Sequence, residues 1–337
     1  MYRENVAIAG LTTMRLGGAA RYVAEINAAE EISEAYKFAR EKGLPVFILG
    51  EGANCIGRDE GYDGVILLSK IKGIEVVSES DGKMVVKAYG GEIWDDLVQY
   101  TAERGYSGIE AMSAIPGTVG AAPVQNIGAY GQDVSQVIES VEAYDSREDR
   151  MVELGAGEMK MGYRRSIFNY GEDAGRYFIV SVNLRLRRGE MEQPFYANLQ
   201  KYIDEHGETD FGPMNIRKMV MAIRGEKLPD PKYIASSGSF FKNVNLSNVE
   251  AEAARARGIN VWSKNGKNTV NSGWLIEQAG LRGAEFYGMR VSDKAALILI
   301  NESAGSYADL ARARAQIVEV VEEKFGLVLE QEPVEIV

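Results

Sequence analysis

Apolar residues recur at intervals of three and four in several parts of the chain, a spacing that is typical of amphipathic helices. Each stretch is bounded by a residue that favours a helix end, either glycine or proline after it or serine before it. The expected helices are one that precedes Gly43 and carries Ile32, Ala35, Tyr36 and Ala39, one at 92–104 with Ile93, Leu97 and Tyr100, a short one at 273–280, and one at 307–325 with Leu310, Ala313, Ile317, Val320 and Val321.

Short apolar runs that are rich in β-branched and aromatic residues predict strands between these helices. The tail of the chain alternates between apolar and polar residues, as a further strand would. The expected strands cover 45–49, 84–89, 140–144, 178–186 and 295–300, together with the alternating tail at 327–337. This mixture of elements predicts an α+β fold.

The order of the elements suggests three parts and a returning tail. Helices and strands alternate over 1–70, whereas strands predominate over 71–225. A third region, 226–327, opens at a turn that two prolines punctuate. We expect 328–337 to return to the first part as a strand.

Two glycine-rich segments are the first candidates for a binding site. The segment Ser113–Gly131 holds four glycines and two prolines but no charge. It indicates either a rigid main-chain surface against a flat or phosphorylated ligand, or a buried hairpin with tight turns. A second turn, Gly50–Asn54, directly follows the strand at 45–49 and favours nucleotide binding. It is not a dinucleotide fingerprint, because that motif would require glycine at Cys55.

Composition narrows the chemistry further. The 337 residues carry a net charge of −11, which disfavours nucleic acid as a partner, and a hydrophobic content of 45% excludes a disordered chain. The single Cys55 and the single His206 leave no catalytic triad, no intrachain disulfide and no zinc motif, so we expect no metal. His206 lies in a polar turn and is expected to be exposed. No signal peptide or membrane span is expected, and the protein is predicted to be cytoplasmic.

Two further segments carry side chains that could take part in catalysis or binding, and each also has a simpler structural interpretation. Ser236–Asn243 is rich in serine, and a serine hydroxyl can donate a proton to a strong base; the alternative is a strand with a serine-rich turn. Arg164 can bind a carboxylate through its planar fork, or can pack its stem on Tyr163. Three lysines, at 227, 232 and 242, are weaker candidates for gripping phosphate.

Seven motifs along the chain occur together in one enzyme family. They are Ile48–Asn54, Ile115–Gly131, Tyr163–Phe168, Lys227–Lys232, Gly238–Asn243, Gly273–Gln278 and Leu329–Glu332. In this order they resemble the UDP-N-acetylenolpyruvoylglucosamine reductases, and the resemblance extends from about Leu11 to Glu332. Gln193–Tyr196 is similar to the additional loop of the longer subtype of that family, which carries a tyrosine.

The resemblance implies an FAD-binding fold of the vanillyl-alcohol oxidase type. Two FAD-binding lobes would lie at 1–70 and 71–225, and an α+β substrate-binding domain at 226–327. It implies noncovalent FAD, NADPH as the reducing cosubstrate, and reduction of an enolpyruvyl nucleotide sugar to UDP-N-acetylmuramate in peptidoglycan precursor synthesis. The partners would be these small molecules, with no nucleic acid and no membrane, and we expect a monomer.

The same motifs imply roles for individual residues. Ser239 would deliver the proton, while Arg164 and Glu332 would hold the enol-like intermediate. The implied substrate-binding residues are Tyr196, Lys227, Asn243 and Gln278. The implied cofactor-binding residues are Gly50, Gly52, Ala53, Asn54, Ile115, Pro116, Gly117, Gly120, Gln125, Asn126, Gly128, Ala129 and Tyr130.

The tail departs from the family pattern, which usually has proline between two glutamates. Here Gln331 separates Glu330 from Glu332, and proline follows at Pro333. Both glutamates are candidates for the catalytic position, since residues two apart in a strand share a face. The family register favours Glu332. The segment after Pro333 also lacks the basic residue that is usual in the family.

Two other functions remain open at this stage. One is a different flavin oxidoreductase of the same fold, for which His206 and Cys55 are the only candidates for covalent FAD attachment. The other is a nucleotide-sugar binding protein that has lost its catalytic activity, against which the intact Arg164, Ser239 and Glu332 argue. Bleaching of a yellow protein by NADPH would distinguish them.

Overall fold

The computed structural model describes residues 2–264 and 266–337. Met1 and Asn265, which fall in the predicted parts 1–70 and 226–327, lie outside the described residues. The chain forms two compact units, each built from segments that are distant in sequence. Unit 1 comprises residues up to Val6, Ala20–Glu51 and Asp63–Glu226, and unit 2 comprises Ala7–Ala19, Gly52–Tyr62 and Lys227–Val337. The division into three lobes stays a prediction. The two units are defined by contacts between residues, whereas the predicted lobes are defined by the ligand that each would bind.

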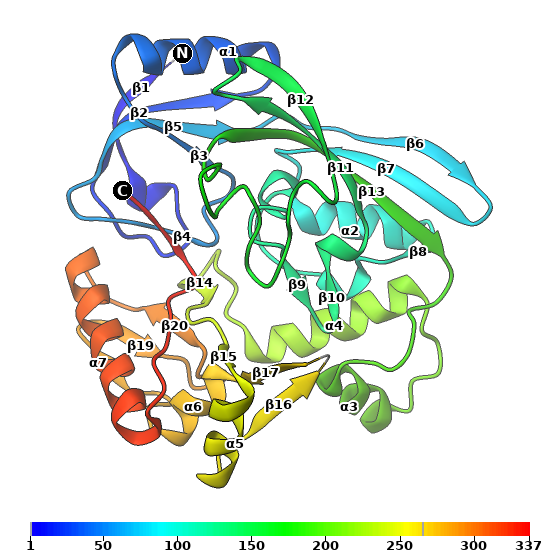
Figure 1. The fold of residues 1–337 in the computed structure, drawn as a ribbon, viewed down its shortest axis with the longest axis vertical. Coiled ribbons are helices and arrows are strands. Elements are labelled where there is room, and N and C mark those ends of the chain that lie inside the picture. Colours follow the sequence, from blue (N-terminus) through cyan, green and yellow to red (C-terminus); the bar gives the residue numbers. More distant parts are fainter. Residues whose placement is uncertain (1, 265) are drawn as a thin grey trace. The chain divides into compact units, whose positions relative to one another are not determined.

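Unit 1 contains two larger sheets and four helices (Figure 1). The first sheet has the order β1-β2-β5-β3, in which β3 and β5 are parallel. The second has the order β12-β11-β13-β7-β6, with β8 paired to β13. The strands are β1 (Arg3–Ala7), β2 (Ala19–Ile26), β3 (Val46–Leu49), β5 (Tyr62–Ser69), β6 (Ile74–Ser80), β7 (Lys83–Tyr89), β8 (Tyr106–Ser107), β11 (Ile138–Asp145), β12 (Arg150–Gly155) and β13 (Tyr177–Arg188).

The helices of unit 1 cover the sheets with their apolar faces. α1 (Glu30–Glu41) buries the four side chains that its sequence pattern marks, and it packs with β5. α2 (Trp94–Glu103) packs with β7 and β13, and it starts two residues later than expected, with Ile93 as its N-cap. A small hairpin of β9 (Gly128–Ala129) and β10 (Gln132–Asp133) also belongs to this unit.

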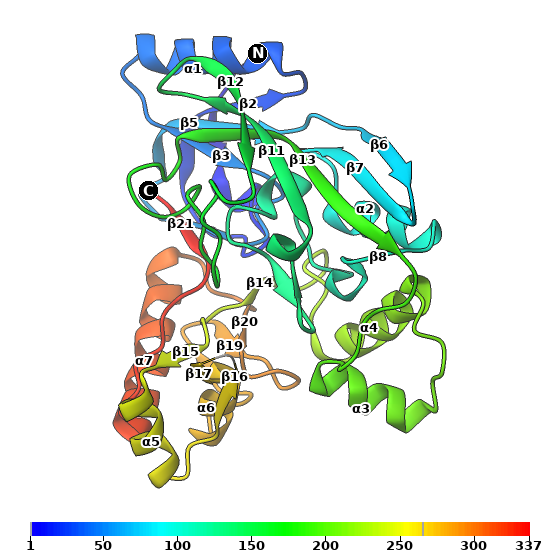
Figure 2. The same ribbon diagram turned by 45° about the vertical axis from the view of Figure 1, so that its right-hand side comes forward.

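α3 (Ala197–His206) and α4 (Pro213–Lys227) are helices that the sequence analysis did not include (Figure 2). They share a small core, to which Leu199, Ile203, Ile216 and Val220 contribute. The expectation that strands predominate up to residue 225 is therefore wrong for the last thirty residues. His206 is exposed as expected, but it is the last residue of α3 rather than part of a turn.

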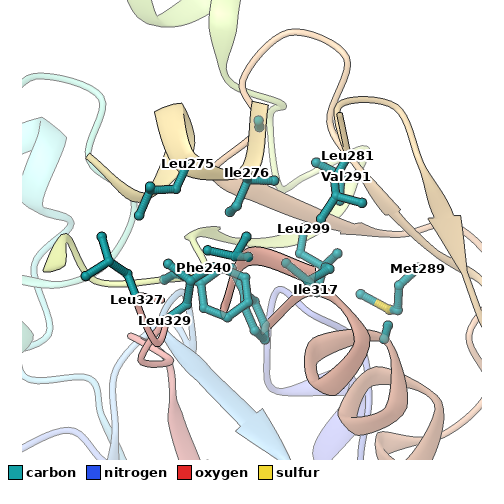
Figure 3. Close-up of a cluster of buried hydrophobic side chains, with 14 of the residues drawn as sticks. Phe240, Leu275, Ile276, Leu281, Met289, Val291, Leu299, Ile317, Leu327 and Leu329 are labelled. Carbon is teal, nitrogen blue, oxygen red and sulfur yellow. The ribbon is translucent and has the colours of Figure 1, made fainter. Parts of the chain in front are cut away.

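Unit 2 is built around one apolar core, part of which is drawn in Figure 3. Its sheets have the orders β14-β20-β19-β18, β15-β17-β16 and β21-β4. The strands are β4 (Cys55–Gly57), β14 (Ala235–Ser239), β15 (Val244–Leu246), β16 (Val261–Lys264), β17 (Lys267–Val270), β18 (Glu285–Phe286), β19 (Met289–Val291), β20 (Ile298–Asn301) and β21 (Val334–Ile336).

The helices of unit 2 are α5 (Asn248–Ala256), α6 (Ser272–Gln278) and α7 (Tyr307–Phe325). The predicted cap of α7 is confirmed, because Ser306 Oγ accepts a hydrogen bond from the Asp309 N–H at 3.1 Å. The tail supplies β21, which pairs in parallel with β4, a strand from within residues 1–70. The residues Met14, Leu16 and Ile56 join the same core as Phe240, so early segments of the chain help to support the C-terminal region.

Four short 3₁₀ turns complete the described elements: η1 (Ile8–Gly10), η2 (Glu110–Met112), η3 (Val119–Ala121) and η4 (Val134–Gln136). Within the part of the chain that the structure describes, no helix is long and apolar enough to cross a membrane.

Candidate cofactor and substrate site

The glycine-rich segment Ser113–Gly131 is held against the start of α2 by main-chain hydrogen bonds. The Trp94 N–H donates to the Gly117 carbonyl at 3.0 Å, and the Gly120 N–H donates to Gly90 at 2.9 Å. A Cβ atom on Gly120 would lie 3.0 Å from the Gly90 backbone. The two chain segments therefore approach each other as closely as two glycines allow, and the segment forms a fixed main-chain surface.

The second glycine-rich turn meets this surface within unit 1. A Cβ atom on Gly50 would lie 2.4 Å from Thr118 Oγ1, closer than real Cβ atoms come to any heavy atom. Thr118 is 2% exposed, and its hydroxyl has no hydrogen-bond partner among the described residues. Gly117 has φ +127° and open space where a side chain would stand. An unsatisfied buried hydroxyl beside open glycine backbone fits a polar, flat ligand such as FAD.

Ala114 is clamped from both sides by charged residues that the sequence analysis did not single out. Its N–H donates to Asp95 Oδ1 at 2.6 Å, and its carbonyl accepts from Arg224 Nη2 at 3.1 Å. Asp95 also accepts two hydrogen bonds from Arg217, whose side chain is 6% exposed. Burial alone would raise the pKa of Asp95, but hydrogen bonds from Arg217 and Ala114 bring it below its usual value.

Arg224 is a further candidate for contact with an anionic ligand. Its Nε atom is buried without a hydrogen-bond partner in the described residues, and desolvation lowers the pKa of its guanidinium. Burial also raises the pKa of Tyr130, whose hydroxyl lies near this guanidinium. A signal for Arg224 existed in the sequence, since it stands three residues before Lys227 at the end of an unrecognised amphipathic helix.

The rings of Tyr130 and Tyr196 lie together in unit 1. Tyr130 has φ +49° in the turn between β9 and β10, next to Gly131 at φ +88°. Its ring packs edge-on against that of Tyr196, with centroids 6.0 Å apart. Tyr196 is the N-cap of α3 and is 45% exposed, so its ring is accessible at the surface of unit 1.

Arg164 lies next to the glycine-rich segment, and its side chain also lies near Tyr163, as the simpler interpretation expects. Its Nη1 donates to the Asn126 carbonyl at 3.5 Å, and its guanidinium carbon stands 5.4 Å from the Tyr163 ring centroid. Arg164 has φ +53°, a conformation that few residues with a side chain adopt. Asn126 in turn donates to Gly162 at 3.1 Å, which ties the arginine loop to the predicted cofactor segment.

In unit 2 the predicted cofactor residues Gly52, Ala53 and Asn54 pack against an early segment and the tail. Gly52 has φ +64°, and a Cβ atom there would lie 2.1 Å from the Leu11 carbonyl oxygen, so only glycine fits. The Thr13 N–H donates to Gly52 at 3.2 Å, and the Val334 N–H donates to Asn54 at 2.9 Å.

Ser239 is the last residue of β14, directly after an irregularity in the strand. Ser236 pairs with Ile300 and Ser239 with Ile298, so the register shifts between them, and Gly238 has φ +69°. Such a bulge re-aims the following side chain and is frequent next to active sites. The backbone therefore has the form of the simpler alternative, a strand with a serine-rich turn, and the role of Ser239 as proton donor stays a prediction. Phe240, which follows, is fully buried and anchors this strand end in the core (Figure 3).

The two candidate glutamates of the tail have different surroundings. The Glu332 N–H donates to the Phe240 carbonyl at 2.9 Å, so Glu332 is bonded to the residue that follows Ser239. Glu332 is half-buried, whereas the Glu330 side chain is 74% exposed and forms an ion pair with Lys242. The ion pair also occupies Lys242, one of the three candidates for gripping phosphate.

The predicted substrate residues of unit 2 are more scattered. Asn243 Oδ1 accepts from the Ser272 N–H at 3.2 Å, at the start of α6, whereas Gln278 is the exposed last residue of that helix. Asn243 and Gln278 therefore lie at opposite ends of α6. Lys227 is exposed at the end of α4.

The described residues contain no group of three or more His, Cys, Asp or Glu side chains that could hold a metal ion. Burial raises the pKa of the Cys55 thiol to about 12, so it stays protonated and unreactive at neutral pH.

Two family models match the chain. One covers the glycine-rich segments, and the other covers the segment that carries Ser239. The model described as FAD binding domain matches residues 20–155. The model described as UDP-N-acetylenolpyruvoylglucosamine reductase, C-terminal domain, matches residues 230–336. The chain is thus an FAD-binding oxidoreductase with a fold of the vanillyl-alcohol oxidase type and an added C-terminal domain.

Whole-chain comparisons identify the family. The UDP-N-acetylenolpyruvoylglucosamine reductase of Ralstonia nicotianae is 39% identical over 329 residues, which cover 96% of this chain and 95% of the relative. The protein of the same name from Pseudomonas aeruginosa is 34% identical and covers 98% of each chain. The crystal structure of the Thermus caldophilus reductase shares the fold, with a TM-score of 0.70 at 21% identity over 99% of both chains. The chain belongs to the UDP-N-acetylenolpyruvoylglucosamine reductase family.

Proposed function

We propose that the protein reduces the enolpyruvyl ether of UDP-N-acetylglucosamine to the lactyl ether of UDP-N-acetylmuramate, with NADPH as the reductant. The reaction adds a hydride to one carbon of the vinyl group and a proton to the other. The observation that carries the proposal is the pairing in unit 2 of the strand end at Ser239 with the tail at Glu332, in a chain of this family. The product is a precursor of bacterial peptidoglycan.

FAD fits the glycine-rich surfaces described above, and Gly50, Gly117 and Thr118 are the residues that would hold it in unit 1. When bound, FAD accepts two electrons from NADPH and supplies a hydride to the vinyl carbon of the enolpyruvyl group. The chain itself supplies the main-chain groups that orient it. Since no described cysteine or histidine lies in these segments, we propose that FAD is bound noncovalently.

Ser239 donates the proton in the proposed reaction. Hydride addition leaves negative charge on the carbon next to the carboxylate, and this carbanion is basic enough to take a proton from a serine hydroxyl. The O–H bond of Ser239 breaks, a C–H bond forms, and the serine oxygen then recovers a proton from solvent. The bulge at Gly238 supports this role, because it sets the direction of the Ser239 side chain independently of the regular strand.

Arg164 and Glu332 act on the charge that develops on the substrate. Arg164 places a permanent positive charge beside the proposed cofactor segment, and such a charge stabilises an enolate most when it is held in place beforehand. Glu332 is the half-buried carboxylate of the tail, and it orients the carboxyl end of the intermediate in the proposal.

Tyr196 stands as an exposed ring beside Tyr130, where it suits contact with the uridine or sugar of the substrate. Lys227 provides an exposed positive charge for a diphosphate, and we assign Asn243 and Gln278 to substrate binding by family position alone. Soluble nucleotide substrates suit a cytoplasmic enzyme, and we propose that it acts as a monomer.

The first experiment follows the colour of the purified protein under anaerobic conditions. It should be yellow, NADPH should bleach it, and the enolpyruvyl nucleotide should restore the colour with formation of one lactyl product per NADPH. Bleaching that only oxygen reverses would contradict the proposed substrate while leaving the flavin assignment intact.

The second experiment separates the two half-reactions in Ser239→Ala by stopped flow. Reduction of the flavin by NADPH should keep its rate, whereas reoxidation by the nucleotide should slow by about 10²–10⁴-fold, the usual contribution of a positioned proton donor. Ser237→Ala is the matched control, because Ser237 lies in the same strand and is buried. Equal slowing of both half-reactions in Ser239→Ala would mean that this serine supports the fold or the cofactor instead.

A further inference from the structure

Besides the main-chain pairing of β21 with β4, the tail of unit 2 is held by a group of side chains, and Glu335 lies at their centre. Glu335 Oε2 accepts from Arg58 Nε at 2.8 Å and from Arg58 Nη2 at 2.5 Å. Its other oxygen, Oε1, accepts from Arg314 Nη1 at 2.9 Å and from the Tyr307 hydroxyl at 2.6 Å. Oε2 is thus bonded to Arg58, which directly follows β4, and Oε1 is bonded to two residues of α7.

The same network reaches Gln331, the residue between the two candidate glutamates. Arg314 Nη1 donates to Gln331 Oε1 at 2.5 Å, and Gln331 Nε2 donates to Glu335 Oε1 at 3.3 Å and to the Pro333 carbonyl at 2.8 Å. Both ends of the Gln331 amide are therefore bonded. We call Arg58, Tyr307, Arg314, Gln331 and Glu335 the tail network.

The main chain around Gln331 lies before β21 and makes a shorter pairing than that strand does. Gln331 forms a single antiparallel bridge with Phe241, flanked by two hydrogen bonds, from Lys242 N–H to Glu330 and from Glu332 N–H to Phe240. Neighbouring residues in extended chain point to opposite sides. When the tail network holds Gln331 on one side, Glu330 and Glu332 must point to the other.

From this arrangement we infer that Glu335 is a positioning residue for the proposed reduction: through Arg314 and Gln331 it fixes the tail so that Glu332 keeps its place beside the strand end that carries Ser239. The inference rests on the proposed function for its effect on catalysis. Glu335 is not a catalytic residue in the proposed reaction, because both of its carboxylate oxygens accept hydrogen bonds from the tail network.

Glu335→Gln tests the inference, because it keeps the size of the side chain and replaces one acceptor oxygen with a donor that faces an arginine. We expect flavin reduction by NADPH to be unchanged and the rate of reoxidation by saturating enolpyruvyl nucleotide to fall by about 10–100-fold, as for a catalytic group displaced by a fraction of an ångström to an ångström. The KM for the nucleotide should change little. Glu302→Gln is the matched control, since it breaks an ion pair with Arg290 elsewhere in unit 2.

A second variant separates positioning from a general loss of stability. The N–H of Gln331 takes no part in the two hydrogen bonds that flank its bridge, so proline is compatible with this position. Proline restricts the backbone of the tail through its own ring, so it needs no hydrogen bond from another side chain. In the double variant Gln331→Pro/Glu335→Gln, reoxidation should recover to within about threefold of wild type, because a stiff backbone replaces the lost side-chain bonds. No recovery in a folded, flavin-replete double variant would overturn the inference.

Hydrogen exchange at the Glu332 amide gives a readout that does not depend on activity. In Glu335→Gln this amide should exchange faster than in wild type and in Glu302→Gln, whereas core amides of α7 should keep their protection. Unchanged exchange at Glu332 would overturn the inference even if turnover fell. If wild-type protein is not reoxidised by the nucleotide, the proposed function fails, and exchange alone still decides whether Glu335 fixes the tail.

Discussion

Two segments that carry predicted site residues are fixed in opposite ways. The glycine-rich segment of unit 1 is placed by backbone approach: Gly120 lies against Gly90, and Gly50 lies against Thr118. The tail of unit 2 pairs with β4 from Val334 onward, but its earlier part has one bridge, at Gln331, and depends on the charged tail network around Glu335. At Gly50 and Gly120 the first arrangement leaves no room for an added atom, whereas the second depends on the charge of Glu335 and its partners.

The difference follows from what each segment presents. A surface that offers its own N–H and C=O groups to a flat cofactor cannot also carry bulky side chains, so close packing has to hold it. A segment that presents one carboxylate needs only that carboxylate to be held in place, and long side chains from α7 suffice. Substitutions in the first segment should therefore act on stability and cofactor content, and those in the second chiefly on rate, with a smaller effect on stability.

The largest effect on stability is expected at Asp95, the charged residue that holds Ala114 of the glycine-rich segment. Asp95→Asn leaves Arg217 largely buried beside a neutral amide. We expect a loss of about 3 kcal/mol in unfolding free energy, near the lower end for breaking one side of a buried ion pair. Urea denaturation monitored by intrinsic fluorescence measures it. Asp63→Asn, at an exposed ion pair with Arg21 in the same unit, should leave the midpoint unchanged, and equal midpoints for both variants would contradict the clamp.

Gly50→Ala should have the next largest effect. Its new methyl group would lie 2.4 Å from the buried Thr118 hydroxyl oxygen, so either the turn or the threonine must move. Overpacking of this kind costs about 1–3 kcal/mol, and FAD per chain, measured after acid release, should fall with it. Gly157→Ala is the control, since nothing lies within 4 Å of a Cβ atom there. Normal FAD content in Gly50→Ala would show that this approach does not shape the cofactor surface.

Much of the fold could be predicted because its signals are local. The four apolar positions of α1 and the serine cap of α7 were identified from spacing alone, and both are present in the structure. α4 has an equally clear signal in Ile216, Met219, Val220 and Ile223, which recur at helical spacing, so this helix was also predictable from its sequence. α3 buries only Leu199 and Ile203, so its pattern is weak.

The site was predictable where glycine or serine marks a backbone conformation, as at Gly52 and Gly238. It was not predictable where charges far apart in sequence meet. Asp95 and Arg217 are 122 positions apart, and Arg58 and Glu335 are 277 apart. No local rule pairs such residues, because their contact depends on which strands and helices pack together.

A smaller effect is expected from acid on the tail network. Burial by itself would raise the pKa of Glu335, but hydrogen bonds from Tyr307, Arg58 and Arg314 outweigh it and lower the pKa to about 2, from an ordinary value of 4.5. A carboxyl with a depressed pKa stabilises the fold fully above its ordinary value and loses that contribution as the pH falls toward the folded-state value. The difference in urea midpoint between wild type and Glu335→Gln should thus shrink between pH 5 and pH 3. A constant difference would contradict this assignment.

The smallest effect is expected at Glu330. Comparing Glu330→Gln with Glu332→Gln tests which of the two glutamates is catalytic. Its exposed ion pair with Lys242 contributes little, so Glu330→Gln should leave turnover within about twofold of wild type. Glu332→Gln has the same shape change two residues away, but its carboxylate is half-buried beside the strand end that carries Ser239. An amide cannot exchange a proton or carry the charge that orients the intermediate, so turnover with saturating NADPH and enolpyruvyl nucleotide should fall strongly. Both variants should keep full flavin content. If Glu330→Gln is the inactive one, the family register is wrong by two residues, and the catalytic carboxylate lies two residues earlier on the same side of the tail, opposite Gln331.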